Sequence, residues 1–288
     1  MILDFGNIDG SIDAMISTWA EFRNALANNK FSYDEVDKAL NCVFMRQLND
    51  FFNDHGCKEI YTKKLSDVFI SRNEVLRGTK LKENENPDYN RFIPMSKYIT
   101  EDNRFSPEKV EWLYLAIGNL KAGDNIAKSC CIKECKAEKG QRFGTCHFKM
   151  NPLFANAKLV DLTIGCEYSI EQLQAGFDVE IKKMLNKTLR VFKASGIKIP
   201  TDKKKIEAIT GKWFSYHYAK LLSEELFLPV DGDKKFMYSP FQCLASYFKH
   251  LGFEGIIYSS VAFPKAKNVV LFDKEMAEPC GAIEIFIV

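Results

Sequence analysis

Apolar residues recur every three or four positions through the N-terminal part of the chain, which is the spacing of one face of a helix. A first helix is predicted over residues 11–28. A second is predicted from Ser32, which forms a capping-box pattern with Glu35, to a left-handed stop at Gly56. The apolar stripe of the first helix consists of Ile12, Met15, Ile16, Trp19, Phe22 and Leu26. Residues 1–60 are therefore predicted to form a helical N-terminal region.

Near residue 60 the pattern changes to shorter runs that are typical of strands. Residues 67–80 lead into a polar loop, 82–92, that is rich in asparagine and proline. Further strand-like runs follow at 110–117, before 158–162 and twice within 255–272. Because these runs alternate with helical patterns, residues 61–288 are predicted to form a second region with both helices and strands.

Four helices are predicted among these strands. The first runs from Asn125 to Glu138, is capped by Asp124 and is ended by Gly140. The others are the segments 167–195 and 203–227, and a helix with Ser239 as its cap, Pro240 at its first position and Gly252 after its end. The last of them leads directly into a strand.

That strand ends in three polar residues, Tyr258, Ser259 and Ser260. Successive side chains alternate between the two faces of a strand, so Tyr258 and Ser260 share one face and Ser259 points to the other. Only one serine can therefore face a cleft together with Tyr258, and Ser260 is the candidate. In an earlier strand Tyr114 points away from its apolar neighbours; it is either a second polar candidate or a packed core tyrosine.

Composition narrows the functional classes. The 288 residues are 46% hydrophobic, which is enough for a substantial core. Forty basic and 38 acidic residues leave a net charge of +2, so no strong field attracts nucleic acid or an anionic membrane. The chain shows neither a leader-like start nor an apolar stretch that approaches a membrane span. We therefore expect a cytoplasmic protein with no direct nucleic-acid partner and no membrane partner.

The nine cysteines are expected to be free thiols, because their number is odd and their spacing is not that of a small secreted domain. Cys130, Cys131, Cys135, Cys146 and His147 offer metal-binding groups. Adjacent cysteines on a helix point apart, however, and no second C-x-x-C pair follows, so no metal site is predicted. A spatial pairing of Cys135 with His147 as a nucleophile stays open. The sequence contains neither a G-x-G-x-x-G fingerprint nor a P-loop.

Charged residues supply the other candidates. Glu134 shares a helical face with Ile126 and Cys130, and a carboxylate on an apolar stripe needs partners because an unpaired charge removed from water is costly. A helix cap or a pair with a nearby lysine would also explain it. Arg77 ends a strand-like run and Arg104 precedes one. Either arginine alone could be an ordinary surface charge. Two planar guanidinium groups close together, however, would suit the oxygens of a phosphate.

Six motifs occur in one order along the chain: "VLRGTK", "DNRFSPEKVEWLYLA", "SCCIKEC", "KLVDL", "YSPFQCLASYFKHLGFEGIIYSSVAF" and "NVVLF". In this order they resemble the RES domain family, which is named for an arginine, a glutamate and a serine. The resemblance runs from about residue 65 to residue 273. Residues 1–60 are additional to it.

The resemblance assigns site residues by position. The family's two arginines fall on Arg77 and Arg104, its tyrosine on Tyr114, its glutamate on Glu134 with Glu138 as the alternative, its serine on Ser260 and its asparagine on Asn268. It implies a catalytic set made up of Arg104, Tyr114, Glu134 and Ser260. It also implies that substrate is bound by Arg77, Arg104, Tyr114, Ser260 and Asn268.

The same resemblance implies a fold and an activity. The fold would be α+β, similar to the ADP-ribosyltransferase core, with two small sheets around a cleft. NAD+ would be a substrate and not a cofactor, and its nicotinamide–ribose bond would be cleaved with water or phosphate as acceptor. Such members often act as bacterial toxins that are neutralised by an Xre-type antitoxin with a helix-turn-helix DNA-binding domain.

Two alternatives stay open beside this interpretation. One is an enzyme that transfers ADP-ribose to a macromolecule. The other is a non-catalytic interaction module whose N-terminal helices bind a neutralising protein or a second subunit, the latter giving a homo-oligomer.

Overall fold

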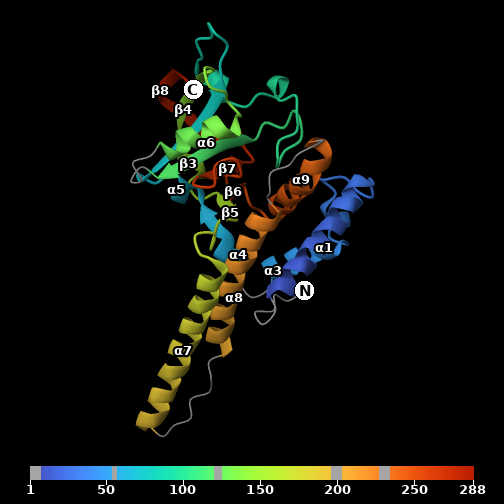
Figure 1. Cartoon of the computed structure of the whole chain (residues 1–288), viewed down its shortest axis with the longest axis vertical. Helices are drawn as coiled ribbons and strands as arrows, with labels where there is room; N and C mark the ends of the chain where they lie inside the picture. The colour runs from blue at the N-terminus through green and yellow to red at the C-terminus, as the bar shows by residue number, and fades with distance from the viewer. Residues whose placement is uncertain (1–7, 54–56, 120–124, 196–202, 227–233) are drawn as a thin grey trace.

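The computed structural model describes residues 8–53, 57–119, 125–195, 203–226 and 234–288. In these ranges the chain is an α+β protein whose strands pair into one eight-stranded sheet, ordered β1-β5-β6-β7-β3-β2-β4-β8 (Figure 1). All neighbouring strands are antiparallel except β5 and β6. The two separate small sheets expected from the resemblance are not found in the described ranges, because the ladder between β3 and β7 joins the strands into one sheet.

The sheet is built from segments of very different length. Its strands are β1 (Thr62–Lys64), β2 (Asn73–Lys80), β3 (Leu113–Asn119), β4 (Arg142–Met150), β5 (Lys158–Asp161), β6 (Gly255–Ser259), β7 (Lys267–Leu271) and β8 (Ala277–Ile287). The predicted strand before 158–162 is confirmed as β4, and the two within 255–272 are confirmed as β6 and β7. The shortest strand, β1, forms one edge of the sheet and the longest, β8, forms the other.

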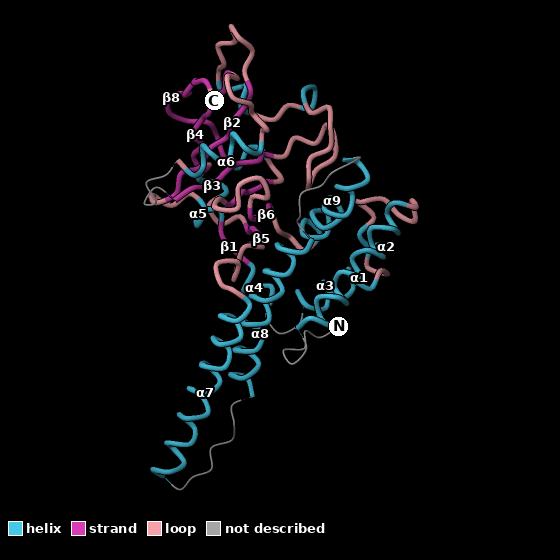
Figure 2. The backbone as a smooth tube through the Cα atoms, in the orientation of Figure 1, coloured by secondary structure: helices cyan, strands magenta, loops and turns pink. Residues whose placement is uncertain are grey.

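Helices account for most of the remaining chain, and Figure 2 shows them gathered mainly on one side of the sheet. They are α1 (Ile8–Ala27), α2 (Val36–Ala39), α3 (Val43–Asn53), α4 (Cys57–Tyr61), α5 (Leu65–Val68), α6 (Ile126–Glu134), α7 (Ile170–Ser195), α8 (Lys203–Leu221) and α9 (Lys234–His250). A π-helical turn, Leu222–Leu226, continues α8. The predicted helices at 11–28, 167–195 and 203–227 are confirmed as α1, α7 and α8 with this turn.

The single helix predicted from Ser32 is wrong, because the segment forms two helices, α2 and α3, separated at residues 40–42. The Ser32 backbone N–H does donate to Glu35 Oε2 at 2.8 Å, as in a capping box. The Ser32 hydroxyl, however, bonds to the Asp34 carboxylate and does not cap the helix. Glu35 takes the N-cap position of α2, which is only four residues long. The predicted stop at Gly56 falls outside the described residues.

The predicted C-terminal end of the helix at 125–138 is also wrong, whereas its start agrees to within one residue. The helix α6 ends at Glu134, because Lys136 adopts a left-handed conformation with φ of 48°. The Lys136 and Ala137 amides donate to the carbonyls of Lys133 and Ile132, which is a Schellman motif with lysine in place of glycine. Gly140 lies beyond this stop, and the predicted cap Asp124 falls outside the described residues.

Two other boundaries differ from the pattern. The helix α9 begins at Lys234, so Pro240 lies inside it. The helical turn before the proline makes a tertiary contact that favours the longer helix. The ring of Tyr238, in that turn, lies 5.8 Å from the Arg104 guanidinium.

The strand predicted at 110–117 begins only at Leu113. Its first residues belong to the preceding loop, because Glu111 accepts hydrogen bonds from the Ser96 amide and from Lys274 Nζ, both at 2.6 Å.

The N-terminal helices share a hydrophobic core with the rest of the chain. The Trp19 ring of α1 lies 5.0 Å from Phe44 of α3 and 5.4 Å from Phe241 of α9. Ile256 and Val270 of the central strands belong to the same buried cluster. Helices α1 and α3 therefore pack on α9, and a domain boundary near residue 60 stays a prediction.

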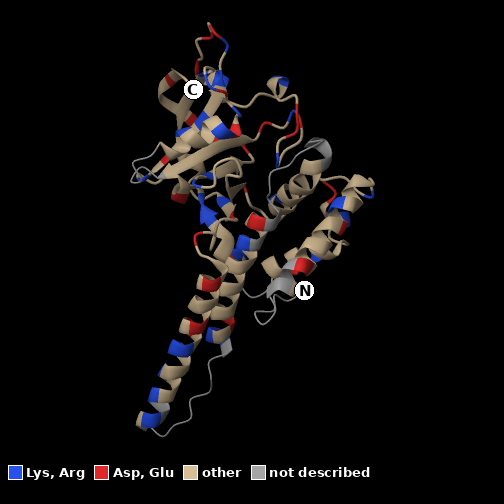
Figure 3. Ribbon diagram, in the orientation of Figure 1, with Lys and Arg blue, Asp and Glu red and all other residues tan. Residues whose placement is uncertain are grey.

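The hairpin of α7 and α8 projects from the body of the molecule (Figure 1). It is held by Glu180 of α7, which accepts hydrogen bonds from Lys212 Nζ at 2.7 Å and from Trp213 Nε1 at 3.0 Å. Figure 3 shows lysine and arginine positions concentrated toward the free end of α7. Within the described residues, no helix has both the length and the apolar character that crossing a membrane requires.

Candidate functional site

A cleft of about 480 Å³ lies between α6, the central strands and the loop of residues 93–112. Four of the residues predicted from the family resemblance line it: Arg77 from β2, Tyr114 from β3, Glu134 from the end of α6 and Asn268 from β7. Tyr258 of β6 lines it as well. The cleft therefore brings together side chains that are far apart in the sequence.

Glu134 is the most firmly held of these residues. Its Oε1 accepts a hydrogen bond from Ser260 Oγ at 2.6 Å and another from Asn268 Nδ2 at 2.7 Å. These hydrogen bonds are partly buried and supply the partners expected for a carboxylate on an apolar stripe, although the residue as a whole is exposed. The reason is the early stop of α6, which makes Glu134 the last residue of the helix. A negative charge at a helix C-terminus is disfavoured by the helix dipole, and two donors offset that cost.

The strands β6 and β7 place the two donors. Ser260 follows the last residue of β6 and is 1% exposed, whereas Ser259 is half-buried on the other face. Asn268 lies opposite Tyr258 in the ladder between β6 and β7. The Ser260 hydroxyl also accepts a hydrogen bond from the Phe263 amide at 2.9 Å, which fixes its orientation. The alternation predicted from the sequence is thus confirmed: Ser260 is the serine that reaches the cleft residues.

Arg77 presents an unusual donor. Its Nη1 nitrogen is fully buried and has no hydrogen-bond partner among the described residues. Burial lowers the pKa of the guanidinium to about 10, an effect that the nearby thiols of Cys135 and Cys131 partly oppose, so the group stays protonated at neutral pH. A buried donor left without an acceptor costs about 1–3 kcal/mol, and more when it is charged. The Arg77 side chain as a whole is half-buried and lines the cleft, so the part of it other than Nη1 can meet a ligand there.

Two tyrosines complete the inner wall. The Tyr114 hydroxyl lies 3.0 Å from Ser106 Oγ, and burial raises the pKa of Tyr114 well above its ordinary value. Burial also raises the pKa of Tyr258, and the charge of Glu134 raises it further. Both side chains are therefore neutral phenols at physiological pH, able to donate a hydrogen bond or to pack against a planar ring.

Arg104 occupies a different place from the other predicted residues. Its guanidinium lies 5.0 Å from the centre of the Phe241 ring and 5.8 Å from that of Tyr238, both on α9. Its neighbour Asn103 lines the cleft, while Arg104 does not. The structure therefore puts Arg77 in the cleft wall and puts Arg104 against aromatic side chains of α9.

The alternative glutamate, Glu138, is exposed beyond the end of α6 and is not among the residues that line the cleft. Its backbone amide donates to the side chain of Gln141 at 3.2 Å. Of the two glutamates, Glu134 is the one that contacts Ser260 and Asn268.

All nine cysteines are free thiols. Burial raises the pKa of Cys130 to about 12 and that of Cys135 to about 11, so both are protonated at neutral pH. The possible nucleophile pair is not assembled. Cys135 Sγ lies 3.5 Å from the carbonyl oxygen of Gly78, whereas His147 Nε2 lies 3.9 Å from the Glu74 carboxylate. Across the described residues, no three metal-binding side chains of the His, Cys, Asp or Glu type cluster together.

Sequence reasoning missed one wall of the cleft. The loop at 93–112 contributes Tyr98, Ile99, Thr100, Glu101 and Asn103. These residues have no helical or strand period, so no pattern marks them. Ser106, which is fully buried beside Tyr114, was missed for the same reason.

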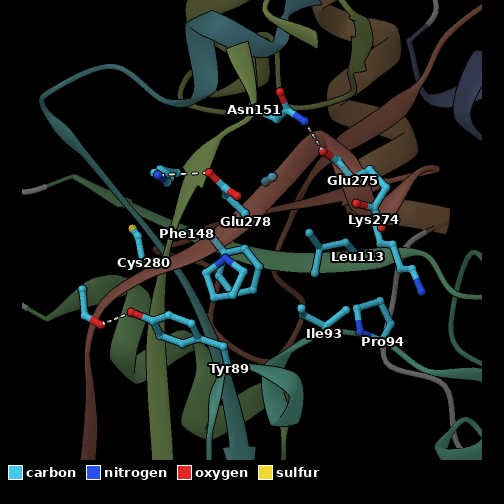
Figure 4. Close-up of a pocket in the computed structure, with 14 residues that line it drawn as sticks. Tyr89, Ile93, Pro94, Leu113, Phe148, Asn151, Lys274, Glu275, Glu278 and Cys280 are labelled. Atoms are coloured by element: carbon cyan, nitrogen blue, oxygen red, sulfur yellow. Dashed lines mark hydrogen bonds and ion pairs between the residues drawn. The ribbon is translucent and has the colours of Figure 1, made fainter. Parts of the chain in front are cut away.

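A second hollow of about 630 Å³ lies on the opposite face of β3, where Leu113 points (Figure 4). Its floor is apolar, with Ile93 and Phe148, and several of its polar groups are paired within its wall. Asn151 Nδ2, for example, donates to the carbonyl oxygen of Glu275 at 3.0 Å. None of the six predicted residues lines this hollow.

Comparisons of the chain with protein-family models, with curated proteins and with solved structures find no match. The candidate site therefore rests on the geometry of the cleft around Glu134 and on the order of the sequence motifs.

Proposed function

We propose that the chain is an enzyme that cleaves the bond between nicotinamide and ribose in NAD+. The observation that carries the proposal is the arrangement of Glu134. Ser260 and Asn268 both donate to Oε1, so among the described residues Oε2 is the oxygen left for a ligand in the cleft. A fixed carboxylate suits a reaction that develops positive charge on a sugar.

Cleavage of the nicotinamide–ribose bond is such a reaction. As the bond between the ribose C1′ and the nicotinamide nitrogen breaks, its electron pair leaves with nicotinamide, which becomes neutral, and positive charge develops on the ribose. The Glu134 carboxylate would stabilise this oxocarbenium-like state electrostatically. Water then attacks C1′ and loses a proton, which gives nicotinamide, ADP-ribose and H+. With phosphate as acceptor the second product would be a phosphorylated ADP-ribose.

The other cleft residues have roles in this proposal. Arg77, whose side chain lines the cleft, would bind a pyrophosphate oxygen of NAD+. The neutral phenol of Tyr114 would pack against the nicotinamide end or donate a hydrogen bond to it. Ser260 and Asn268 act here through Glu134, a role that replaces the direct substrate contacts implied by the family resemblance. Arg104 would support the cleft by packing on Phe241.

The proposal extends to the fold and to the biology. The α+β core around the cleft would be similar to that of ADP-ribosyltransferases, with its strands joined into one sheet. A protein that removes NAD+ would stop the growth of a cell that makes it, so a role as a toxin held by an antitoxin belongs to the same proposal. Induced expression of the chain should arrest growth, and expression of a Glu134→Gln variant should not.

The test of the reaction uses NAD+ labelled in its adenylate phosphate, with and without inorganic phosphate. Labelled ADP-ribose as the sole product indicates hydrolysis, and labelled phosphorylated ADP-ribose in phosphate buffer indicates phosphorolysis. Label on protein or nucleic acid would indicate transfer to a macromolecule instead. Unchanged NAD+ would contradict the proposal and favour a non-catalytic module.

A further inference from the structure

The two edge strands of the sheet differ in length and in side chains, and this difference decides which edge could pair with a strand of another molecule. The edge strand β1 has only three residues, Thr62–Lys64, and carries two lysines, which are features that protect an edge from pairing. The other edge strand, β8, has 11 residues. Its last part carries two exposed large apolar side chains, Ile285 at 41% and Ile287 at 64% exposure. A long apolar edge is a template for pairing with another strand.

The backbone of this part of β8 shows which groups point outward. The Val288 amide donates to the Gln141 carbonyl, and the Val288 carbonyl accepts from the Gly140 amide, so both groups of Val288 face toward β4. Backbone groups of alternate residues point to alternate sides of a strand in an antiparallel ladder. The irregularity between β4 and β8 lies earlier, between Thr145 and His147, so the pattern holds for the last residues. The N–H and C=O groups of Ile285 and Ile287 therefore face away from β4.

The geometry points to a second copy of this chain as the partner of that edge. An antiparallel pair of identical strands about a two-fold axis at Phe286 places Ile285 of one copy opposite Ile287 of the other. Both residues have outward backbone groups, so each such pair exchanges two hydrogen bonds. The apolar side chains of these pairs then lie side by side on one face of the joined sheet.

Charge favours the same register. Glu284 is the one charged residue among residues 281–288, and the two-fold axis places it opposite Val288 and not opposite another Glu284. Within its own copy Glu284 is already paired with Lys128 Nζ at 2.9 Å. The pairing therefore places no like-charged side chains opposite each other. The cleft around Glu134 takes no part in it, so the inference is independent of the proposed activity.

The test is the mass of the protein in solution, measured by sedimentation over a concentration series. We expect wild type to reach twice the monomer mass. Ile285→Pro removes an N–H that faces outward and not toward β4, so the variant should keep its fold, shown by an unchanged circular dichroism spectrum, and should dimerise at least tenfold more weakly. Leu153→Lys is the matched control, because Leu153 is 90% exposed but lies outside β8. It should dimerise like wild type.

A wild-type protein that stays monomeric throughout, or an Ile285→Pro variant that dimerises as wild type does, would overturn the inference. A cysteine variant tests the register without a proline. Opposite residues in a non-hydrogen-bonded pair have Cα atoms about 4.5 Å apart, which a disulfide can span. Phe286→Cys, treated with diamide as oxidant, should therefore give a covalent dimer. Ile287→Cys, which would face Ile285, should not, and equal cross-linking of the two variants would contradict the register.

Discussion

Two donors on one carboxylate oxygen define the site at the scale of single residues. Ser260 comes from the end of β6 and Asn268 from β7, so the position of Glu134 depends on two neighbouring strands at once. Loss of either donor leaves the other in place. Loss of the carboxylate itself removes the group that would face the developing charge.

The paired serines give a sharp comparison. Ser260→Ala should lower the rate of nicotinamide release about 10- to 100-fold, because it removes one of the donors that orient Glu134. Ser259→Ala is the matched control: it changes the same side chain one position earlier, on the opposite face of the strand, and should leave the rate near that of wild type. Rates measured with saturating NAD+ would decide the matter, and equal effects of the two substitutions would contradict the assignment.

Substitution of Arg77 is expected to make the protein more stable and to abolish its activity. Arg77→Met removes a buried charged donor without a partner and keeps an apolar stem of similar length, so the free energy of unfolding should rise by about 1–3 kcal/mol. Nicotinamide release should be lost. Denaturant unfolding of the NAD+-free protein measures the first effect. Arg91→Met is the control, since Arg91 pairs with Glu85 at the surface and should change stability by less than about 1 kcal/mol. An Arg77→Met variant less stable than wild type would contradict this reading of the buried nitrogen.

Much of the site could be predicted at this scale, and the reasons are specific. Alternation along one strand selects Ser260 over Ser259, and the motif order points to Glu134 and Asn268. The hydrogen bonds among them could not be predicted, because they depend on the early end of α6. Ser106 could not be predicted either, because it lies in a loop without a period and meets Tyr114 only through the fold.

At the scale of elements, the loop 93–112 is the part of the cleft that needs its own anchor. Glu111 supplies it by accepting hydrogen bonds from the Ser96 amide within the loop and from Lys274 beyond β7, both at 2.6 Å. These bonds lower the pKa of Glu111 to about 2, with the Lys274 bond as the larger cause.

The lowered pKa predicts a pH dependence. A carboxyl group with a lowered pKa in the folded protein stabilises that protein above its unfolded pKa, near 4.5, and this contribution is lost as the pH falls toward 2. Glu111→Gln should therefore lower the melting temperature at pH 7, and the difference from wild type should shrink between pH 4.5 and 2. Glu108→Gln is the control, because Glu108 has only a 3.8 Å contact with Lys109. A difference that stays constant over that pH range would contradict the role of Glu111.

Element types were easier to predict from sequence than element ends. Apolar periodicity finds α1, because its long apolar stripe packs against α3 and α9. It misplaces the ends of α6 and α9, where local conformation and tertiary contacts decide. Lys136 stops α6 in a conformation that usually favours glycine, and contacts of the turn before Pro240 extend α9 toward the N-terminus.

For the whole molecule, the shared core makes the N-terminal helices part of the fold. Phe22, Phe44 and Trp19 are almost fully buried, and they pack in one cluster with Phe241 and Ile256. Sequence patterns could find the apolar stripes of these helices but not the surface that covers them. Sequence patterns also could not show that the strands join into one sheet, because the pairing of β3 with β7 links segments that are far apart in the chain.

Two deletions test this arrangement. Removal of residues 1–53 exposes the apolar face of α9, so the remaining chain should be insoluble or should lack a cooperative melting transition. Replacement of residues 184–208 by a short glycine–serine linker removes only the projecting end of the α7–α8 hairpin. That variant should melt within a few degrees of wild type. A soluble, cooperatively melting chain without residues 1–53 would show that the region after residue 60 folds alone.

The measurement that tests the central claim most directly is the release of nicotinamide from NAD+ by the purified protein, followed by chromatography and mass detection. Wild type should release one nicotinamide for each NAD+ consumed, and Glu134→Gln, which keeps the size of the side chain but not its charge, should be slower by about 1,000-fold or more. Glu138→Gln should behave like wild type. No release of nicotinamide by wild type, or equal rates for wild type and Glu134→Gln, would contradict the account.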